Sequence, residues 1–477
     1  MSEGPSMTTR DGGRTPAVLA NLQSRLAASV ERHGVPSAAI GVRMGERTYE
    51  AAAGWANRSV GIEATTGSVY HFGSTTKMLT ATLVMRLVDQ GLVDLDAPIA
   101  SYVAEFAPPD PTMARRITVR HCLSHQGGLV GIIFAETGSN DDTVARQVGL
   151  INGAPQYHSP GAMLSYCNSG LILLGRLIES VLRKPWHAAV VQDLAQPLGM
   201  RSVASRPEQA LRQRYAIGHV PDPGSGKWIP DPYPYWMPGH GPAGSTCAGS
   251  VGDLLSFAAM HLQDGKALDG TRFLSEQTAR AMREQQIASP AQFLYSGFGL
   301  GWVQYDWGGR RILGHDGSTA GSNSFLRVDP ENQLAVSLLV NCRAGMPVYE
   351  DLFSEIFREL TGSWESAAPP VQDGATKDLD RYVGTYEDGA VRVRVERAAD
   401  GLTMAVEPVV STPLTKTLTQ RLVLHPWAPG QFFVNGRDAM LGVPNAPEST
   451  KLVRPYAVIE ADGTKWFHNG NSAFRSV

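Results

Sequence analysis

The most regular hydrophobic pattern of the chain predicts a buried helix in its first quarter. The apolar residues that recur at three- and four-residue spacing are Met78, Leu79, Ala81, Leu83, Val84, Leu87 and Val88. Gly91 follows at the place where a glycine ends a helix. Ser74 and Lys77 lie at the start of this pattern, one turn apart on the same face. We therefore expect Ser74 at or near the N-terminus of a buried helix.

Further patterns predict a sheet that is built from both ends of the first 360 residues. An amphipathic helix ending near Gly34 precedes two strand-like runs, 37–44 and 48–54. Strand-like runs at 310–314, 322–328 and 333–341 then lead into a closing helix at 348–360. The segment between is mainly helical, and Ser250 begins one of its helices as a capping box. We predict an α+β domain with one antiparallel sheet, covered by the two terminal helices, and a helical insertion.

The last hundred residues show a different pattern, typical of a small all-β barrel. Short alternating runs occur at 382–386, 391–395, 402–406, 421–424, 432–434, 456–460 and 465–468, with turn residues between them. The Pro- and Gly-containing stretch before them is typical of a linker. The predicted organisation is a disordered tail at 1–15, a first domain at 16–362, a linker at 363–377 and the barrel at 378–477.

Composition narrows the range of partners. The 477 residues carry 42 basic and 45 acidic side chains, a formal charge of −3, so we expect neither nucleic acid nor a membrane surface as partner. The polar N-terminus lacks the apolar region of a secretory signal, and no apolar run is long enough to span a membrane. We therefore expect a soluble cytoplasmic protein, and a monomer. The four scattered cysteines show no zinc spacing, so no metal and no cofactor is expected; they are Cys122, Cys167, Cys247 and Cys342.

Ser74 and Lys77 form a Ser-x-x-Lys pair, which is typical of an activated serine nucleophile. A serine at a helix N-terminus gains from the positive end of the helix dipole as it takes on negative character. A lysine in an apolar setting can lose its proton near neutral pH and act as a base. The alternative is a chance match on an ordinary core helix. Among the eight lysines, only Lys77 has a serine three residues before it, which favours the nucleophile.

Two further short elements could meet this pair. Tyr166 and Asn168 make the only Tyr-x-Asn of the chain and precede a predicted helix at 171–182. Gly314-His315-Asp316-Gly317 ends a predicted strand of the terminal sheet, and a glycine there lets a substrate backbone come close. His-x-Gly also occurs at His71 and His125, so His315 is selected only by its place on that strand.

In order and spacing these three elements resemble the penicillin-binding-protein and serine β-lactamase superfamily over roughly residues 16–362. The resemblance is greatest to the class C β-lactamase-like branch, in which a tyrosine serves as base. It extends to the segments 123–129, 242–245 and 298–302, and the barrel looks like the lipocalin-like domain of some members. A satisfied hydrogen-bond network at a helix start remains the structural alternative for Tyr166 and Asn168.

The resemblance implies a role for each residue. Ser74 would attack an acyl carbon, and Lys77 and Tyr166 would share its proton. Asn168 would hold the lysine and the substrate amide, and His315 would relay a proton through Tyr166. The backbone N–H groups of Ser74 and Ser318 would form the oxyanion hole, with Gly317 beside them.

Three features bear on the acyl donor. Without an export signal, the donor should be an internal metabolite. Asp316 places a negative charge where cell-wall enzymes carry a positive one, which favours an ammonium group unless this side chain points to solvent. The loop 221–244, rich in proline and aromatics and including Trp236, could with the barrel exclude water and so favour aminolysis.

These traits resemble the penicillin-binding-protein-type thioesterases of non-ribosomal peptide pathways, which release a peptide from a carrier-protein thioester and cyclise it head to tail. In that group an arginine of the small domain helps to place the substrate terminus, so Arg475 and Arg454 are candidates. His240 stands where some members carry an acidic residue. The partner would be a peptidyl thioester, possibly on a carrier protein. Two alternatives stay open: a cytoplasmic esterase, D-amino-acid amidase or D-aminopeptidase of the same superfamily, and an inactive binding module that kept the fold.

Overall fold

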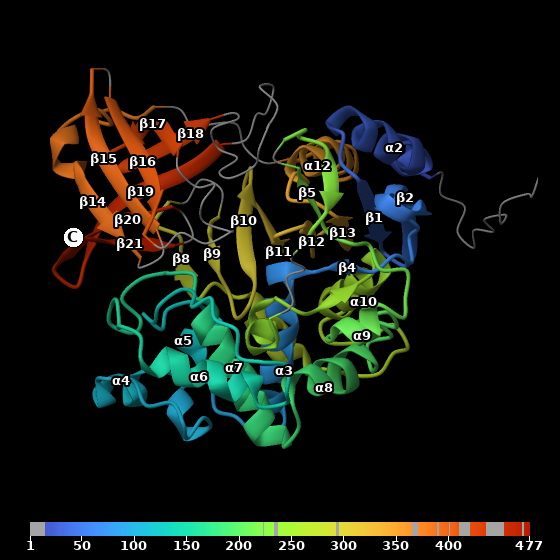
Figure 1. Ribbon diagram of the computed structural model, residues 1–477, viewed down its shortest axis with the longest axis horizontal. Helices are drawn as coiled ribbons and strands as arrows, with labels where there is room; N and C mark the ends of the chain where they lie inside the picture. Colours follow the sequence, from blue (N-terminus) through green and yellow to red (C-terminus); the bar gives the residue numbers. More distant parts are fainter. Residues whose placement is uncertain are drawn as a thin grey trace, which may run out of the picture.

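The computed structural model describes residues 15–222, 224–232, 237–291, 295–364, 371–388, 391–399, 401–409, 420–435, 453–469 and 472–477. Apart from Thr15, the tail expected at 1–15 lies outside these residues. A large α+β part and a separate C-terminal barrel make up the chain, and the barrel stands beside the β8–β10 edge of the large part's sheet (Figure 1). The predicted fold class is confirmed.

One nine-stranded sheet joins the two ends of the large α+β part. Its order is β3-β2-β1-β13-β12-β11-β10-β9-β8. β1 and β13 pair antiparallel at its centre, from Ala38 opposite Val340 to Met44 opposite Leu334. The strands are β1 (Ser37–Met44), β2 (Arg47–Asn57), β3 (Ile62–Glu63), β8 (Ile287–Ala288), β9 (Gly297–Phe298), β10 (Val303–Trp307), β11 (Arg310–Thr319), β12 (Ser322–Asp329) and β13 (Leu334–Val340).

Helices cover both faces of this sheet. The short α1 (Ala17–Ala20), α2 (Leu22–His33) and α12 (Met346–Thr361) share one apolar core with it. On the other face α10 (Val251–Leu262) and the helical insertion share a second core, which is centred on α3 (Thr76–Asp89) and α7 (Asn168–Leu182). The rest of the insertion comprises α4 (Pro111–Arg116), α5 (Val119–Leu123), α6 (Thr143–Asn152), α8 (Trp186–Ala189), the π-helical turn η4 (Val190–Ala195), α9 (Pro207–Ala210), the 3-10 helix η5 (Pro238–Ala243) and α11 (Glu276–Arg283). Two small antiparallel ribbons are formed by β4 (Tyr70–His71) with β7 (Ala248–Gly249) and by β5 (His219–Pro221) with β6 (Trp228–Pro230).

Local sequence signals place the element ends well, with one error. Gly34 adopts the left-handed conformation after α2, Gly91 has φ +71° after α3, and Ser250 forms the predicted capping box with Asp253. The strand predicted to end at Gly314-His315-Asp316-Gly317 is longer than expected. β11 runs on to Thr319 because β12 keeps pairing with it as far as Thr319 opposite Ser322. His315 is therefore inside a strand and not at its end.

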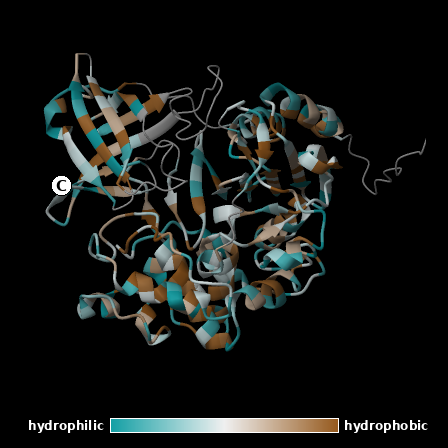
Figure 2. Cartoon of the chain, in the orientation of Figure 1, coloured by the Kyte–Doolittle hydropathy of each residue, from teal (hydrophilic) through white to brown (hydrophobic). Residues whose placement is uncertain are grey.

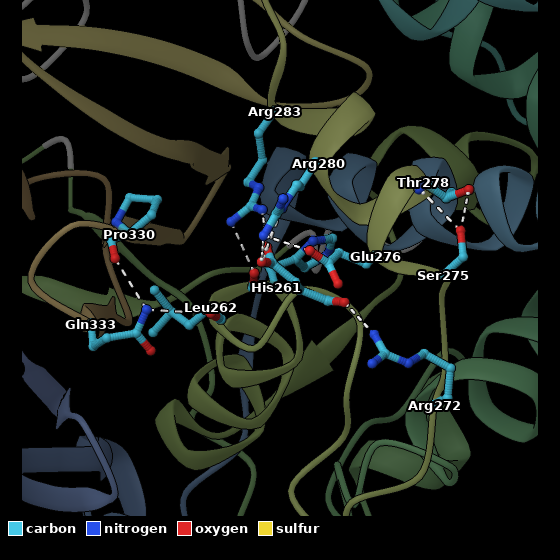
Figure 3. Close-up of polar contacts among 11 residues, drawn as sticks. His261, Leu262, Arg272, Ser275, Glu276, Thr278, Arg280, Arg283, Pro330 and Gln333 are labelled. Carbon is cyan, nitrogen blue, oxygen red and sulfur yellow. Dashed lines mark hydrogen bonds and ion pairs between the residues drawn. The ribbon is translucent and has the colours of Figure 1, made fainter.

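A cluster of charged residues ties α11 to the end of α10 (Figure 3). Asp264, which has φ +47°, accepts hydrogen bonds from the guanidinium groups of Arg280 and Arg283. Arg272 donates to the backbone carbonyl of Asp264 at 2.6 Å. Because these residues lie at the surface end of both helices, the cluster fixes the position of α11 without entering the core.

The C-terminal part is a closed antiparallel barrel of eight strands, with brown and teal positions alternating along them (Figure 2). Its core includes Tyr386, Phe432 and Phe467. The predicted set lacked the last strand, a four-residue segment that closes the barrel against β14. The strands are β14 (Gly384–Glu387), β15 (Val391–Ala398), β16 (Gly401–Pro408), β17 (Gln420–Ala428), β18 (Gln431–Asn435), β19 (Val453–Ala461), β20 (Thr464–His468) and β21 (Ala473–Ser476). Of the helices described, none is long and apolar enough to cross a membrane.

Candidate active site

Ser74 lies in a 3-10 turn, η2 (Gly73–Thr75), directly before α3, and this turn presses against β11. Gly73 has φ +52°, and a Cβ placed on it would stand 2.7 Å from the backbone nitrogen of Ser318. A Cβ on Gly317 would stand 1.9 Å from the carbonyl oxygen of Phe72. Only glycine fits at these two positions, and the close approach puts the backbones of Ser74 and Ser318 side by side. That is the arrangement the predicted oxyanion hole needs.

Lys77 is buried with only 1 % of its surface exposed, and it points at Ser74. Its Nζ donates to Ser74 Oγ at 3.0 Å and to the carbonyl oxygen of Ala243. It also lies 4.8 Å from the centre of the Tyr166 ring. Burial lowers the pKa of Lys77 to about 7, although the nearby Cys167 thiol acts in the opposite direction. Both hydrogen-bond partners are neutral, so this amine can act as a base near neutral pH.

The 3-10 helix η5 forms the wall behind Lys77. Besides the Ala243 contact, Thr80 of α3 donates to the carbonyl oxygen of Pro242 at 2.8 Å. His240 is buried in the same wall, and its Nε2 donates to the Ile133 carbonyl at 2.6 Å. Burial lowers the pKa of His240 to about 4. His240 is therefore a neutral ring near neutral pH.

Tyr166 and Asn168 lie on either side of Cys167, the N-cap residue of α7, whose Sγ accepts from Gly170 N–H. Burial raises the pKa of Tyr166, while a hydrogen bond with the Ser74 side chain opposes the rise. Tyr166 is therefore a neutral phenol beside Ser74.

The position of Asn168 differs from the expectation that it holds Lys77. Its backbone N–H donates to the Gly131 carbonyl at 2.7 Å. Its buried Oδ1 has no hydrogen-bond partner among the described residues. The carbonyl of Ala243 in η5 accepts the hydrogen bond from Lys77 that we expected Asn168 to accept. The Asn168 oxygen stays available to a substrate amide.

His315 reaches the site from β11 as a neutral imidazole. Its Nδ1 donates to the Asp316 carbonyl at 2.7 Å, so the lone pair is on Nε2. Burial, with Lys77 as a further cause, lowers its pKa to about 3. Nε2 is buried without a hydrogen-bond partner in the described part of the chain. The ring centre lies 6.0 Å from that of Tyr166, which places an acceptor next to the phenol.

Asp316 neither points freely to solvent nor presents an unpaired charge to the site. Its two carboxylate oxygens accept from Arg327 at 2.6 and 3.2 Å. Arg327 is 2 % exposed, and its guanidinium packs over the rings of Tyr305 at 4.1 Å and Tyr349 at 5.0 Å. This pairing across β11 and β12 neutralises Asp316, so the expectation that it attracts an ammonium group is wrong.

Sequence reasoning missed the role of His125. This buried residue has φ +59°, and the centre of its ring lies 4.5 Å from that of Tyr166, with the two rings tilted by 32°. Its carbonyl accepts from Ser165 N–H at 2.9 Å and its Nδ1 accepts from Cys167 N–H at 3.0 Å. Both bonds flank Tyr166, so His125 holds the backbone on each side of it. The available signals were the His125-Gln126-Gly127 match and the place of His125 in the segment 123–129, to which the family resemblance extends.

Of the remaining predicted site residues, only Arg475 has a described side chain. Arg475 lies exposed on β21, paired in the ladder with Glu387 and Trp466. Arg454 belongs to β19, but its side chain is outside the described residues, as is the whole of Trp236. Within the described ranges, no group of three His, Cys, Asp or Glu side chains could hold a metal ion. The described cysteines are all buried and free.

Fold and site together define a class of protein. An antiparallel sheet with a helical insertion, a Ser-x-x-Lys helix, a Tyr-x-Asn element and a His-x-Gly strand are the architecture of the penicillin-binding-protein and serine β-lactamase class. The family model for beta-lactamase matches residues 22–360, and the chain belongs to that family of serine hydrolases and acyl transferases.

Individual relatives agree with this assignment. The chain is 39 % identical to "Penicillin-binding protein 4" of Amycolatopsis lactamdurans over 376 residues, 77 % of this chain and 97 % of the relative. It is 31 % identical to "Esterase EstB" of Burkholderia gladioli over 57 % of this chain and 76 % of the relative.

Among solved structures, the crystal structure of SurE superposes with a TM-score of 0.77 at 26 % identity, covering 97 % of this chain and 99 % of that one. A structure of SurE with D-Leu gives a TM-score of 0.73 at 27 % identity, over 97 % of this chain and all of that one. Because the coverage is so high, the similarity to SurE includes the C-terminal barrel.

Proposed function

We propose that Ser74 is the nucleophile of an acyl-transfer enzyme. The observation that carries this proposal is the 3.0 Å contact between Ser74 Oγ and a lysine whose pKa is about 7. The neutral Lys77 takes the proton as Ser74 Oγ forms its bond to the acyl carbon. The N–H groups of Ser74 and Ser318 stabilise the oxyanion. As the bond to the leaving group breaks, the Tyr166 phenol protonates the leaving group and recovers a proton from Lys77.

The edge of β11 supports binding of an extended acyl chain. β10 pairs with β11 only from Arg310 to Gly314, whereas β12 pairs with it up to Thr319. From His315 to Thr319, the edge of β11 that faces away from β12 therefore has no described strand beside it. A peptide can add backbone hydrogen bonds along such an edge. The unpartnered Oδ1 of Asn168 can accept from an amide N–H of the same peptide.

The favoured reaction is release of a peptide from its carrier thioester with head-to-tail cyclisation. The peptide's own amino group attacks the Ser74 ester, an amide bond forms, and Ser74 Oγ regains a proton. The similarity to SurE extends through both the large α+β part and the barrel, and the complex of SurE with D-Leu supports a substrate that carries a D-residue. Because Asp316 is paired with Arg327, the amine would be received as a neutral group, and His315 Nε2 can accept a hydrogen bond from it.

A hydrolase is the second candidate, favoured by the similarity to a relative named an esterase. The same residues would serve, with water in place of the amine. The two candidates therefore differ in what resolves the acyl-enzyme and not in how it forms.

Mass spectrometry of reaction products separates these candidates. The substrates are small-thiol thioesters of linear peptides with free N-termini and a D-residue at the C-terminus. Wild type and Ser74→Ala are compared side by side. We expect a product lighter than the linear acid by one water, present only with Ser74. Only linear acid, again dependent on Ser74, would establish the hydrolase, and turnover that survives Ser74→Ala would contradict the nucleophile itself.

A further inference from the structure

The barrel holds the segment of the catalytic part that leads into Tyr166. Four hydrogen bonds join the two within residues 157–165. Tyr157 OH donates to the Asp388 carbonyl at 2.9 Å, and Ser159 N–H donates to Asp462 Oδ2 at 2.7 Å. These two bonds lie at the far end of the segment, seven or more residues before Tyr166.

The other two bonds reach the last two residues before Tyr166. His468 Nε2 donates to the Leu164 carbonyl at 2.8 Å, and Ala473 N–H donates to Ser165 Oγ at 3.4 Å. The donor residues close the β20–β21 hairpin, in which His468 pairs with Ala473. The hairpin therefore fixes the backbone directly before Tyr166, while His125 fixes it from the side of the catalytic part.

The contact between the barrel and residues 157–165 is shielded from solvent as well as hydrogen-bonded. Trp466 and Ala473 of the barrel form a buried cluster with Met163, and the Trp466 ring meets His158 edge-on at 5.9 Å. His468 is fully buried, so its bond to Leu164 is shielded from water. Burial lowers the pKa of His468 to about 4, so the ring donates as a neutral imidazole throughout the physiological range. Loss of a shielded donor leaves the Leu164 carbonyl unsatisfied, which the backbone can relieve only by moving.

We propose that the barrel is a positioning element for Tyr166, and that His468 is the positioning residue that acts through the Leu164 carbonyl. The proposal rests on the proposed function only for the role of Tyr166 as proton carrier to the leaving group. It gives the barrel a part in the chemical step, whatever the substrate.

Hydrogen exchange tests the positioning without reference to activity. His468→Leu removes the hydrogen-bond donor with little change in side-chain size, whereas His468→Gln retains a donor. Tyr386→Phe is the matched control, because it removes a hydrogen bond to the Tyr382 carbonyl inside the barrel. We expect amide exchange in a peptide covering 163–168 to rise about tenfold in His468→Leu, and to stay near wild type in the other two. Ser165→Ala removes the acceptor for Ala473 N–H and should also raise amide exchange at 163–168. This variant replaces His468→Leu in the test if His468→Leu folds poorly.

Leaving-group dependence tests the consequence for catalysis. A p-nitrophenyl ester needs no protonation of its leaving group, whereas an alkyl ester does. With the alkyl ester, His468→Leu should lower kcat about 10- to 100-fold with little change in KM, and His468→Gln should restore most of it. With the p-nitrophenyl ester the loss should stay within about threefold. In a Tyr166→Phe background, His468→Leu should have almost no further effect on the alkyl ester.

Three outcomes would overturn the proposal: unchanged exchange at 163–168 in both His468→Leu and Ser165→Ala, equal losses with both esters, or additive losses with Tyr166→Phe. Failure of the proposed function is a separate result, because it would appear as absent Ser74-dependent turnover in wild type. The exchange measurement would still decide whether the barrel positions the segment.

Discussion

Two groups of charged residues in the large α+β part differ in their exposure to solvent and in the direction of their pKa shifts. In the cluster around Asp264, the Arg280 side chain is 58 % exposed, and hydrogen bonds from Arg280 and Arg283 hold the pKa of Asp264 below its usual value against the effect of burial (Figure 3). At the active site Lys77 is buried with neutral partners, and its pKa falls to about 7.

Arg327 shows why the partner decides the outcome. It is as deeply buried as Lys77, and burial alone would lower its pKa, yet the carboxylate of Asp316 raises the pKa of Arg327 well above its usual value. A buried cation therefore stays charged beside a carboxylate and gives up its proton beside a hydroxyl and a carbonyl. In this fold Lys77 lies beside the Ser74 hydroxyl and the Ala243 carbonyl, whereas the Asp316 carboxylate is paired with Arg327.

Removing the buried base should have the largest effect. Lys77→Met should lower kcat/KM for an activated ester about 10³-fold, because no other group beside Ser74 Oγ has a pKa near neutrality. Labelling of Ser74 by a fluorophosphonate should slow in parallel. Arg280→Met is the matched control, since it removes a cation from the exposed cluster, and wild-type labelling rates in Lys77→Met would contradict the assignment.

Breaking the buried pair should mainly reduce stability. Arg327→Met leaves Asp316 without its partner and should lower the free energy of unfolding by about 3 kcal/mol, the lower end of the usual range because Asp316 is 31 % exposed. Urea unfolding measures this loss. Adding Asp316→Asn to Arg327→Met should restore part of it, and a double variant no more stable than Arg327→Met would argue against the pair.

The pH dependence of kcat/KM should reflect the ionisation of Lys77 directly. Because the neutral amine is the base, kcat/KM for an activated ester should rise about tenfold per pH unit below pH 7 and level off above it. Lys77→Met should abolish this limb, because it removes the amine that titrates. Asp264→Asn should leave the limb in place. A wild-type limb centred far from pH 7 would contradict Lys77 as the base.

The lowered pKa of Lys77 also makes the free energy of unfolding depend on pH, in a predictable direction. The folded pKa of Lys77, about 7, lies below its ordinary value of 10.5, so the unfolded chain binds more protons between these two values. The contribution of Lys77 to the free energy of unfolding should therefore increase as pH rises through that window. Comparison of wild type with Lys77→Met by urea unfolding at several pH values isolates it, and parallel pH curves for the two proteins would contradict it.

Changes in the exposed cluster should have the smallest effect. Arg280→Gln should leave activity unchanged and move Tm only slightly, since Arg283 still holds Asp264 and exposed ion pairs contribute little. Differential scanning calorimetry at low and high salt measures this, and the small shift should shrink at high salt. A large loss of activity would mean that the cluster communicates with the site.

Local signals in the sequence were sufficient for much of the fold. The 3.6-residue period placed α3, the capping box at Ser250 placed α10, and a short strand-like run placed β1 at its observed bounds. Ser74, Lys77 and Tyr166 could be selected because each belongs to a short motif, and His315 because of its place on a strand of the terminal sheet. The structure brings all four together.

What the sequence did not predict depends on contacts between distant residues. The partner of Asp316 is Arg327, and only the register of β11 on β12 puts them side by side. Ala243 reaches Lys77 because η5 packs on α3, which no local pattern encodes. The same holds for the bond from His468 to Leu164, which joins residues 304 positions apart. The extent of β11 was underestimated because its two glycines resemble a turn when the pairing with β12 is unknown.

The pairing of β1 with β13 also governs when the protein can fold during synthesis. About 290 residues separate Met44 from its partner Leu334, and a ribosome needs roughly 15–60 s to add them. Until then β1 lacks one neighbour, and Ser74 lacks the strand that carries Ser318. Translation of residues 310–340 is therefore the point at which this chain can first acquire an oxyanion hole. A chain released before that point would expose an unpaired apolar strand to aggregation and proteolysis.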